Sequence, residues 1–276
     1  MQNGPAIRLY ALTVLTLGFL LAPVQARAQF QPRGLSDPAT GEQYHIEAGY
    51  DLWFPSADIT VSSESLGIVG SNIDFKRDLG LQDQHLQAVK VVLRPARNHK
   101  FRFQYIPIKY DSTATLATDL IFNGIRYRVG LPVNSTLDWK AYRFSYEYDF
   151  VTKNRGFVGF IMEAKYTDVQ VQLASPVAVE FAHARAPIPA LGGIGRFYVV
   201  PNISITGEFT AFKIPDSIDS RYAAHYVDFD LYGTLNFNNY VGVQAGYRVL
   251  NVGYLIKTDT GSFVLNGLYF GGVVRY

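Results

Sequence analysis

Apolar and polar residues alternate one by one along most of this chain. The clearest stretch is 142–150, where tyrosines and phenylalanines alternate with Arg143, Ser145, Glu147 and Asp149. Successive side chains of a β-strand point to opposite faces, so this stretch predicts a strand with one apolar and one charged face. The same split recurs in 44–54, 158–167, 203–211, 227–235 and 241–249. Because no convincing helical periodicity accompanies it, the pattern predicts an all-β chain.

Connections of two lengths separate these segments. Short polar turns are predicted at 97–100, 152–155, 201–202 and 238–239, and longer loops at 55–84, 112–133, 171–187, 214–223 and 258–262. Short turns at one end and long loops at the other are typical of a closed antiparallel transmembrane β-barrel. We expect about ten strands, with 8 or 12 as alternatives. Their predicted bounds are 43–54, 85–96, 100–111, 134–150, 156–170, 188–199, 202–213, 224–237, 240–257 and 263–276.

Two local signals refine this barrel. Asn123-Gly124 lies between two short apolar runs, which is a strong two-residue hairpin signal, so the third and fourth strands are expected to run on as a projecting hairpin. Pro107 has no backbone N–H to donate, and a bulge or register shift is expected there.

The N-terminus has the pattern of a targeting segment. Arg8 precedes a 14-residue apolar run from Leu9 to Ala22, and Ala26 and Ala28 form an A-x-A cleavage site. This predicts a secretory signal peptide over 1–28, cleaved after Ala28, because the run is shorter than the ~20 residues of a spanning helix. A periplasmic segment, 29–42, and the barrel, 43–276, follow.

Composition excludes several classes of protein. Only 17% of residues are charged and 14% are aromatic, so disorder is excluded. The formal net charge is +2, which gives no basic excess for binding nucleic acid. With no cysteine, the chain has no disulfide, thiolate metal site or cysteine nucleophile. A secreted β-sandwich also has alternating strands, but the aromatic, nearly uninterrupted apolar faces favour the barrel.

The last strand shows a resemblance to a known class. It ends on an aromatic residue, Tyr276, with Val274, Phe270 and Leu268 on the same face and Gly272 as a departure. This pattern resembles the C-terminal insertion signal of bacterial outer-membrane β-barrel proteins. The resemblance covers 43–276 and points to no specific family. It implies a Gram-negative outer-membrane location, contact with outer-membrane lipid and lipopolysaccharide, and recognition by the barrel-assembly machinery during insertion.

If the apolar faces contact lipid, the opposite faces line the lumen. Their charged residues are eight cations and eight carboxylates, and a ten-stranded barrel leaves little room, so they are expected to pair. The predicted lumen network comprises Asp51, Arg143, Glu147, Glu163, Glu208, Asp228, Asp230 and Arg248. Because the signs balance, no ion filter is evident, and the expected role is structural, with a largely plugged lumen, or that of a narrow porin-like channel with surface-exposed loops.

Candidates for chemistry are few. His85, His183 and His225 are expected near the loop end, with Ser217 and Ser220 close to His225. The alternative function is therefore an outer-membrane lipid or peptide hydrolase around His225, although His225 has the opposite parity from Asp228 and Asp230.

Carboxylate pairs give no firmer assignment. Asp228-x-Asp230 is similar to half of the acidic pairs of omptin-like barrels, but no matching partner pair is recognisable. Asp74 and Asp78 in the first long loop are offset by Lys76 and Arg77. With no glycine-rich phosphate cradle either, we expect no enzyme activity, cofactor or metal.

Overall fold

The computed structural model describes residues 38–64, 68–176, 178–214 and 222–276, with only the backbone of Tyr222. The predicted signal peptide, 1–28, and most of the predicted segment 29–42 lie outside these ranges. Among the described residues, no helix is long and apolar enough to cross a membrane.

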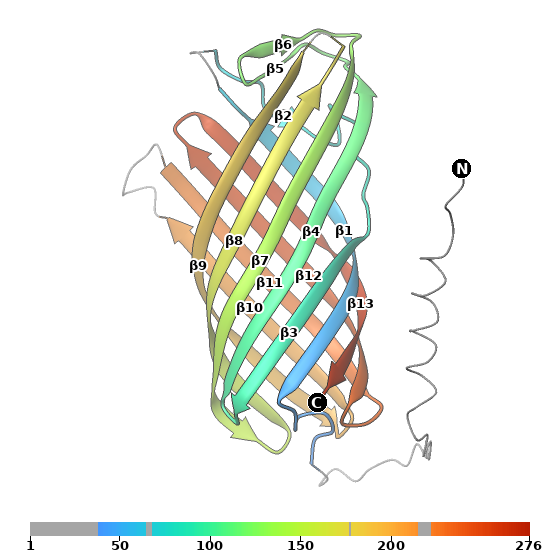
Figure 1. The fold of residues 1–276 in the computed structure, drawn as a ribbon, viewed down its shortest axis with the longest axis vertical. Helices are drawn as coiled ribbons and strands as arrows, with labels where there is room; N and C mark the ends of the chain where they lie inside the picture. Colours follow the sequence, from blue (N-terminus) through green and yellow to red (C-terminus); the bar gives the residue numbers. More distant parts are fainter. Residues whose placement is uncertain (1–37, 65–67, 177, 215–221) are drawn as a thin grey trace, which may run out of the picture. The chain divides into compact units, whose positions relative to one another are not determined.

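Ten antiparallel strands form a closed barrel (Figure 1). They are β1 (Ile46–Ser62), β3 (Leu86–Ala96), β4 (His99–Thr115), β7 (Pro132–Lys153), β8 (Gly156–Ala174), β9 (Val179–Val200), β10 (Ile203–Ile214), β11 (Tyr222–Asn236), β12 (Val241–Ile256) and β13 (Asp259–Arg275). Each strand pairs with the next along the chain, and β13 pairs with β1 from Glu47↔Arg275 to Ser62↔Thr260. The predicted fold class and the count of ten barrel strands are confirmed.

Several strands run further than the alternation predicted. The predicted loop 171–187 is wrong, because β8 and β9 pair without interruption from Gly156↔Phe197 to Ala174↔Val179. Small residues and two prolines in 182–189 concealed the strand, since neither type favours a sheet. They are tolerated because this part of β9 pairs with β8 alone and has an unpaired edge on its other side.

The expected bulge at Pro107 is also absent from the register. β4 pairs with β7 continuously through Pro107↔Lys140. On the other side, the ladder between β3 and β4 ends at Val89↔Tyr105, two residues earlier. The sheet therefore accommodates this proline at an edge and needs no extra residue.

The Asn123-Gly124 hairpin is present but does not continue the barrel strands. β5 (Leu120–Phe122) and β6 (Ile125–Tyr127) form a separate two-stranded sheet, with positive φ at both turn residues. Phe122 and Tyr127 are buried, and the Tyr127 hydroxyl donates to the Leu173 carbonyl oxygen. The hairpin thus packs over the loop end of the barrel.

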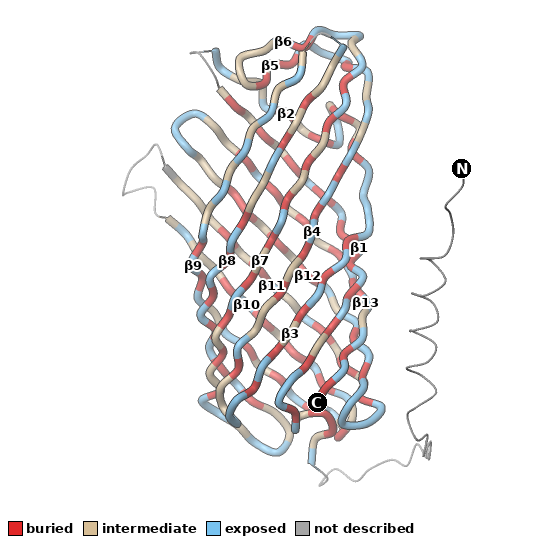
Figure 2. Tube along the Cα trace, in the orientation of Figure 1, coloured by how far each residue is buried: buried red, intermediate tan, exposed pale blue. Residues whose placement is uncertain are grey.

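The polarity of the two barrel faces reverses along the strands. On β7 the end near the short turns has Arg143, Glu147 and Asp149 inside, whereas the end near the long loops has Leu137 and Trp139 inside. The alternation of buried residues with more exposed ones continues unbroken across this reversal, from Val133 to Phe150 (Figure 2). The outward residues of β7 are Asn134, Thr136, Asp138 and Lys140 at the loop end, and Tyr142, Phe144, Tyr146, Tyr148 and Phe150 at the turn end. The barrel therefore has a charged interior in its lower part, near the short turns, and an apolar interior in its upper part, near the long loops.

A connection between β1 and β3 completes the apolar interior. β2 (Ile73–Asp74) pairs with the end of β1, and Phe75, Leu79 and Leu81 after it are buried. The Phe75 amide donates to the Ile59 carbonyl oxygen of β1, and the Ser112 hydroxyl of β4 donates to the Leu79 carbonyl oxygen. This segment therefore bridges β1 and β4 on the loop side of Leu86, where β3 does not separate these two strands.

A row of tyrosines marks the reversal on the outer face. The Tyr105 and Tyr142 rings stack with 4.7 Å between centroids, and the Tyr166 ring lies 6.3 Å from that of Tyr142. Outward apolar residues fill the strands below this row, and Lys140 and Asp168 are among the polar residues above it. Aromatic girdles bound the apolar band of membrane barrels in this way.

This reversal predicts opposite responses to one substitution on one strand face. Phe144→Arg places a cation in the apolar band and should lower the free energy of unfolding in lipid vesicles by about 2 kcal/mol or more. Thr136→Arg, eight residues away on the same outer face, should have little effect. Urea unfolding followed by tryptophan fluorescence measures both, and equal costs would contradict the assigned boundary.

Candidate functional site

The lower interior contains a continuous network of ion pairs centred on Arg143. Its Nη2 lies 2.6 Å from Glu163 Oε1 and 2.8 Å from Glu208 Oε1, and its Nη1 lies 3.2 Å from Asp228 Oδ2. Nη1 also donates to Gln104 Oε1 at 2.8 Å. One guanidinium from β7 therefore contacts carboxylates from β8, β10 and β11, which uses its planar, multi-donor geometry.

The network extends to both sides of Arg143. Arg102 bridges Glu208, at 2.5 Å, and Glu147, at 3.0 Å. Lys100 then links Glu147, at 2.6 Å, to Asp149, at 2.9 Å.

On the other side, Asp228 accepts from Arg248 at 2.8 Å and from Lys165 at 3.1 Å. Residues of β4, β7, β8, β10, β11 and β12 are thus joined across the lumen.

A second cluster lies where the first and last barrel strands meet. Arg275 Nε lies 2.6 Å from Glu47 Oε2, and Arg275 Nη1 donates to Asn236 Oδ1 at 2.7 Å. Both charged side chains are buried, and they form a cross-strand pair on β13 and β1. This ion pair therefore spans the closing seam of the barrel.

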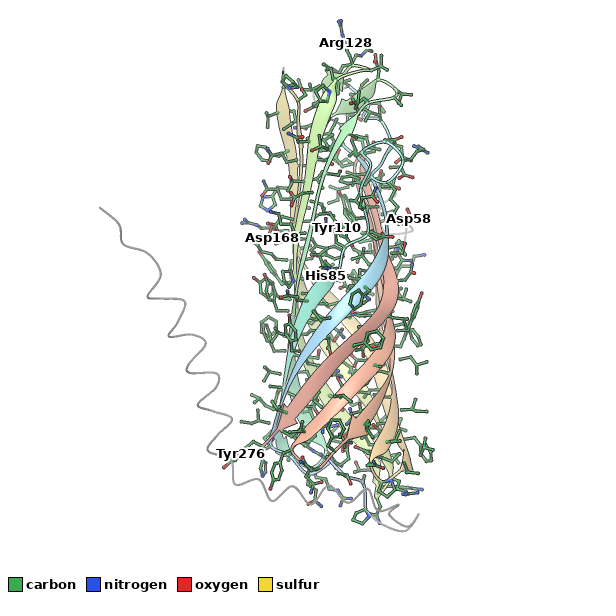
Figure 3. The ribbon with its side chains drawn as sticks, turned by 90° about the vertical axis from the view of Figure 1, so that its right-hand side faces the viewer. Asp58, His85, Tyr110, Arg128, Asp168 and Tyr276 are labelled. Atoms are coloured by element: carbon green, nitrogen blue, oxygen red, sulfur yellow. The ribbon has the colours of Figure 1, made fainter. Side chains whose placement is uncertain are left out.

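Residues 38–45 cross the turn end of the barrel. The Thr40 amide donates to the Pro201 carbonyl oxygen at 2.7 Å. Glu42 Oε1 accepts from Arg196 Nη1 at 2.6 Å and from the Tyr198 hydroxyl at 3.0 Å. Arg94 Nη1 lies 3.7 Å from Glu42 Oε2. Tyr276 lies at this same end (Figure 3), so the described N-terminal segment and the C-terminus lie together.

Glu42 attaches this segment electrostatically. Burial alone would raise the pKa of its carboxyl group, but Arg196, Lys100 and Arg94 together bring the pKa below its ordinary value of 4.5. The carboxylate is therefore more stable in the docked segment than in the unfolded chain.

Asp51 and Asp230 lie beside the central network. The Tyr269 hydroxyl donates to Asp230 Oδ1 at 2.9 Å. Both carboxylates line a void of about 10 Å³ together with Arg248 and Trp53. A second void of about 10 Å³ lies nearer the turn end, lined by Glu47, Lys90 and Arg102 among others. Each has room for about one water molecule.

Six of the eight predicted lumen residues join the central network, and Asp51 and Asp230 adjoin it. The network also contains Arg102, Asp149 and Lys165, which were among the sixteen charged residues expected to line the lumen. Two charged residues of the interior, Lys100 and Glu42, were not among those sixteen. Lys100 was placed at the boundary shared by the predicted turn 97–100 and the predicted strand 100–111 and was not counted as a lumen charge, although it continues the inward parity of Arg102; β4 begins at His99. Glu42 was placed in the N-terminal segment, where no periodicity pointed to the lumen. With both included, the described lumen-facing residues number nine cations and nine carboxylates.

The predicted histidine candidates do not form a catalytic arrangement among the described residues. His225 Nε2 hydrogen-bonds Asn251 Oδ1 at 3.0 Å, while Asp228 is buried on the opposite face of β11. Ser217 and Ser220 lie outside the described residues. His183 bonds Asp168 Oδ1 at 2.6 Å on the outer face, where Figure 3 shows Asp168, and His85 is exposed directly before β3. No group of three or more His, Asp or Glu in the described part of the chain could hold a metal ion.

Comparisons with known proteins place this architecture. No family model matches the sequence, and a search of curated proteins found no match. Among solved structures, the outer membrane protease OmpT of Escherichia coli matches with a TM-score of 0.58 and 8% identity, covering 88% of this chain and 100% of that chain. The fold is that of a bacterial outer-membrane β-barrel protein.

Two further solved structures match with lower scores. A Pseudomonas aeruginosa FadL homologue has a TM-score of 0.39 and 8% identity, covering 78% of this chain and 64% of that chain. The attachment invasion locus protein Ail of Yersinia pestis has a TM-score of 0.34 and 9% identity, covering 82% of this chain and 99% of that chain. At these identities the likeness concerns the fold alone.

The geometry predicts a large effect of Arg143→Ala. Removing the guanidinium leaves Glu163, Glu208 and Asp228 without their shared partner in a lumen with little water, and should cost about 3–5 kcal/mol of unfolding free energy. Arg77→Ala is the matched control, because the Arg77 side chain is exposed in a loop and pairs only with neighbouring Asp78. Urea unfolding in lipid vesicles compares the two, and an Arg143 variant as stable as the control would exclude Arg143 from a buried network.

Acid should release the segment at the turn end. Because the pKa of Glu42 is lower in the folded protein, its contribution is present above pH 4.5 and is lost as the pH falls through the folded pKa. Hydrogen exchange of the Thr40 and Gly41 amides, corrected for intrinsic rates, should lose protection over that range. Glu42→Gln should show weak protection at every pH, while Glu180→Gln at the loop end should behave as wild type. Protection that does not depend on Glu42 would contradict this attachment.

Proposed function

We propose that the protein is an integral barrel of the bacterial outer membrane with a lumen closed to solutes. Its role is structural, with loops exposed at the cell surface. The observation that carries this proposal is the joining of opposite barrel walls by the Arg143 network, above which the interior is lined mainly by apolar side chains.

Residence in the membrane is supported by the outer face. Below the row of Tyr105, Tyr142 and Tyr166, outward residues such as Phe144, Phe160 and Phe209 are exposed and apolar. Burying this surface in water-free hydrocarbon is favourable, whereas exposing so much of it to water is not. The closed ladder from β1 to β13 pairs the strand edges, which a lipid environment requires.

A closed lumen is supported by three successive layers. The Glu42 segment crosses the turn end, the ion pairs fill the middle, and Trp53, Trp139, Leu250 and Phe263 belong to the apolar layer above. An ion would have to displace paired charges and then pass a region whose lining is mainly apolar and carries no charge to replace its hydration. We therefore favour a plug over the narrow channel.

The outer face also supports the expected lipid partners. Lys109, Lys140 and Arg185 project outward just above the tyrosine row, at the height of lipid head groups. Cations at this height suit the phosphates of lipopolysaccharide. The apolar C-terminal strand β13 is available to the assembly machinery before the barrel closes. We propose no enzymatic activity, because the described residues do not bring His225 to a nucleophile or a carboxylate.

Location and closure can be tested on the same preparation. The protein should fractionate with outer membranes and show heat-modifiable mobility on gels. In planar bilayers the wild-type barrel should give no discrete conductance steps. Recovery as a soluble protein without detergent would exclude the membrane assignment, and reproducible steps in the wild type would favour the narrow channel over the plug.

A further inference from the structure

The segment 38–45 leaves an open pocket at the turn end of the barrel. Its volume is about 610 Å³, which lies within the ~300–1,000 Å³ range of small-molecule sites. The segment itself, the turn between β3 and β4 and the turn between β7 and β8 form its walls. Its lining includes the buried rings of Tyr44 and Phe157, and Lys100 Nζ lies 3.5 Å from the centre of the Phe157 ring. The pocket therefore lies inside the ring of turns and reaches the lower end of the lumen.

The charges of the short turns are all positive and lie on one side of this end. The four turns, 97–98, 153–155, 201–202 and 237–240, contain three cations, Arg97, Lys153 and Arg155, and no acidic residue. All three belong to the two turns that border the pocket, whereas the other two turns are uncharged. The bordering turns are neighbours, because the Thr152 hydroxyl donates to Asn98 Oδ1 at 3.4 Å. The turn end thus presents a positive side at the pocket.

Two of these cations line the pocket without an anion of their own. Arg97 and Lys153 are exposed, and their side chains have no partner among the described residues. Glu42 is the one acidic side chain in the lining, and it is already bound by Arg196 and Arg94. Arg94 also donates to the Arg97 carbonyl oxygen at 2.8 Å, which fixes the turn that carries Arg97. The pocket therefore offers two positioned positive charges to an anionic ligand.

The uncharged lining suits a peptide. The side-chain amides of Gln43 and Asn154 line the pocket, are exposed, and have no hydrogen-bond partner in the described part of the chain. Each amide carries donors and an acceptor, the same groups that a peptide backbone presents in return. Tyr44 and Phe157 add apolar surface against which small side chains can pack.

We propose that this pocket binds a carboxylate-bearing peptide, with its carboxylates at Arg97 and Lys153 and its backbone at Gln43 and Asn154. The inference rests on the proposed function, which turns this end of the barrel toward the periplasm. There the same chemistry is available from free peptides and from the stem peptides of the cell wall. A phospholipid fits less well, because the pocket lies inside the ring of turns and the barrel wall separates it from the bilayer.

Binding can be measured with the full chain in discs of phosphatidylcholine. The probe is the acetylated tripeptide alanine–glutamate–alanine, which has two carboxylates. Its analogue with glutamine and a C-terminal amide has the same shape and no charge. By isothermal titration the dicarboxylate should bind at least about tenfold more tightly than the analogue, and added salt should weaken it. Equal affinity for the two peptides, or no binding of either, would overturn the proposal.

Substitutions separate the pocket from general charge attraction. Arg97→Gln and Lys153→Gln should each weaken binding about fivefold, and Arg97→Lys should retain most of the affinity. Arg128→Gln is the matched control, because Arg128 is exposed at the opposite end of the barrel from Tyr276 (Figure 3). Equal losses in the Arg97 and Arg128 variants would overturn the assignment to this pocket.

A filled pocket provides a test that leaves the charges in place. Ala96→Trp, at a lining residue, should abolish binding, while Asn202→Trp, on a turn that does not line the pocket, should leave it unchanged. Undiminished binding by Ala96→Trp would place the peptide elsewhere and overturn the proposal.

Two further arms identify the source of the ligand. Sedimentation of the protein with insoluble cell-wall sacculi, reversed by the free tripeptide, would identify stem peptides. Binding of the tripeptide without sedimentation would identify free peptides, and either result supports the same peptide chemistry. Discs that contain phosphatidylglycerol should bind the tripeptide equally well. Loss of binding in those discs would show that a lipid head group occupies the pocket instead.

The inference and the proposed function fail in different ways. Because the chain has no cysteine, Asn202→Cys and Arg128→Cys each introduce one reactive thiol. An impermeant maleimide should label the Arg128 variant in intact cells, and the Asn202 variant only after the outer membrane is permeabilised. The reverse pattern, or a protein that does not enter discs, would contradict the proposed function. A barrel that enters discs in the expected orientation but binds neither the tripeptide nor sacculi would overturn the peptide site alone.

Discussion

The two-residue period of a β-strand, imposed on a closed sheet, is the constraint on which this structure depends. Every residue of a barrel strand faces either outward or inward, and no position can avoid the choice. At the level of Phe144, outward means apolar and leaves the charged residues inside. At the level of Thr136, outward means polar and leaves Leu137 and Trp139 inside. One uninterrupted alternation thus serves two environments, and only the identity of the residues changes at the tyrosine row.

The charged residues lie inside because the strand period places them there, rather than because their mutual attraction stabilises the barrel strongly. A buried ion pair recovers little beyond the cost of removing its charges from water, so the network is not in itself a large source of stability. Its value lies in what it excludes. A one-residue slip of β7 would move Arg143 and Glu147 to the lipid side and Phe144 to the lumen. Because cations and carboxylates are equal in number, each charge that leaves the lumen leaves an opposite charge there without its partner. The network therefore helps to specify the register.

The sequence predicted those parts of the structure that periodicity controls. Strand number, face and the identity of most lumen charges follow from parity, and Arg143 is placed by parity alone. Lys100 was not counted because it stands where the predicted turn and the predicted strand meet, whereas Glu42 lies in a segment with no periodicity. The long β9 was concealed because prolines and alanines carry no strand signal. β9 and β10 stop pairing at Leu191↔Ala211, just before Pro189 and Pro187. This end of the ladder depends on which strands become neighbours in the folded sheet, and the alternation along one strand does not contain that information.

The Glu47–Arg275 pair has a consequence for how the barrel is completed. Its members lie 228 residues apart, on the first and last barrel strands, and they meet only when the two edges of the sheet join. Until then each charge remains at an open strand edge, where water or other polar groups must hydrogen-bond to it. Closure therefore converts two exposed charges into one buried contact in a single step. The pair forms at the moment when the last free strand edges of the barrel join. A partly closed sheet is therefore not stabilised by it.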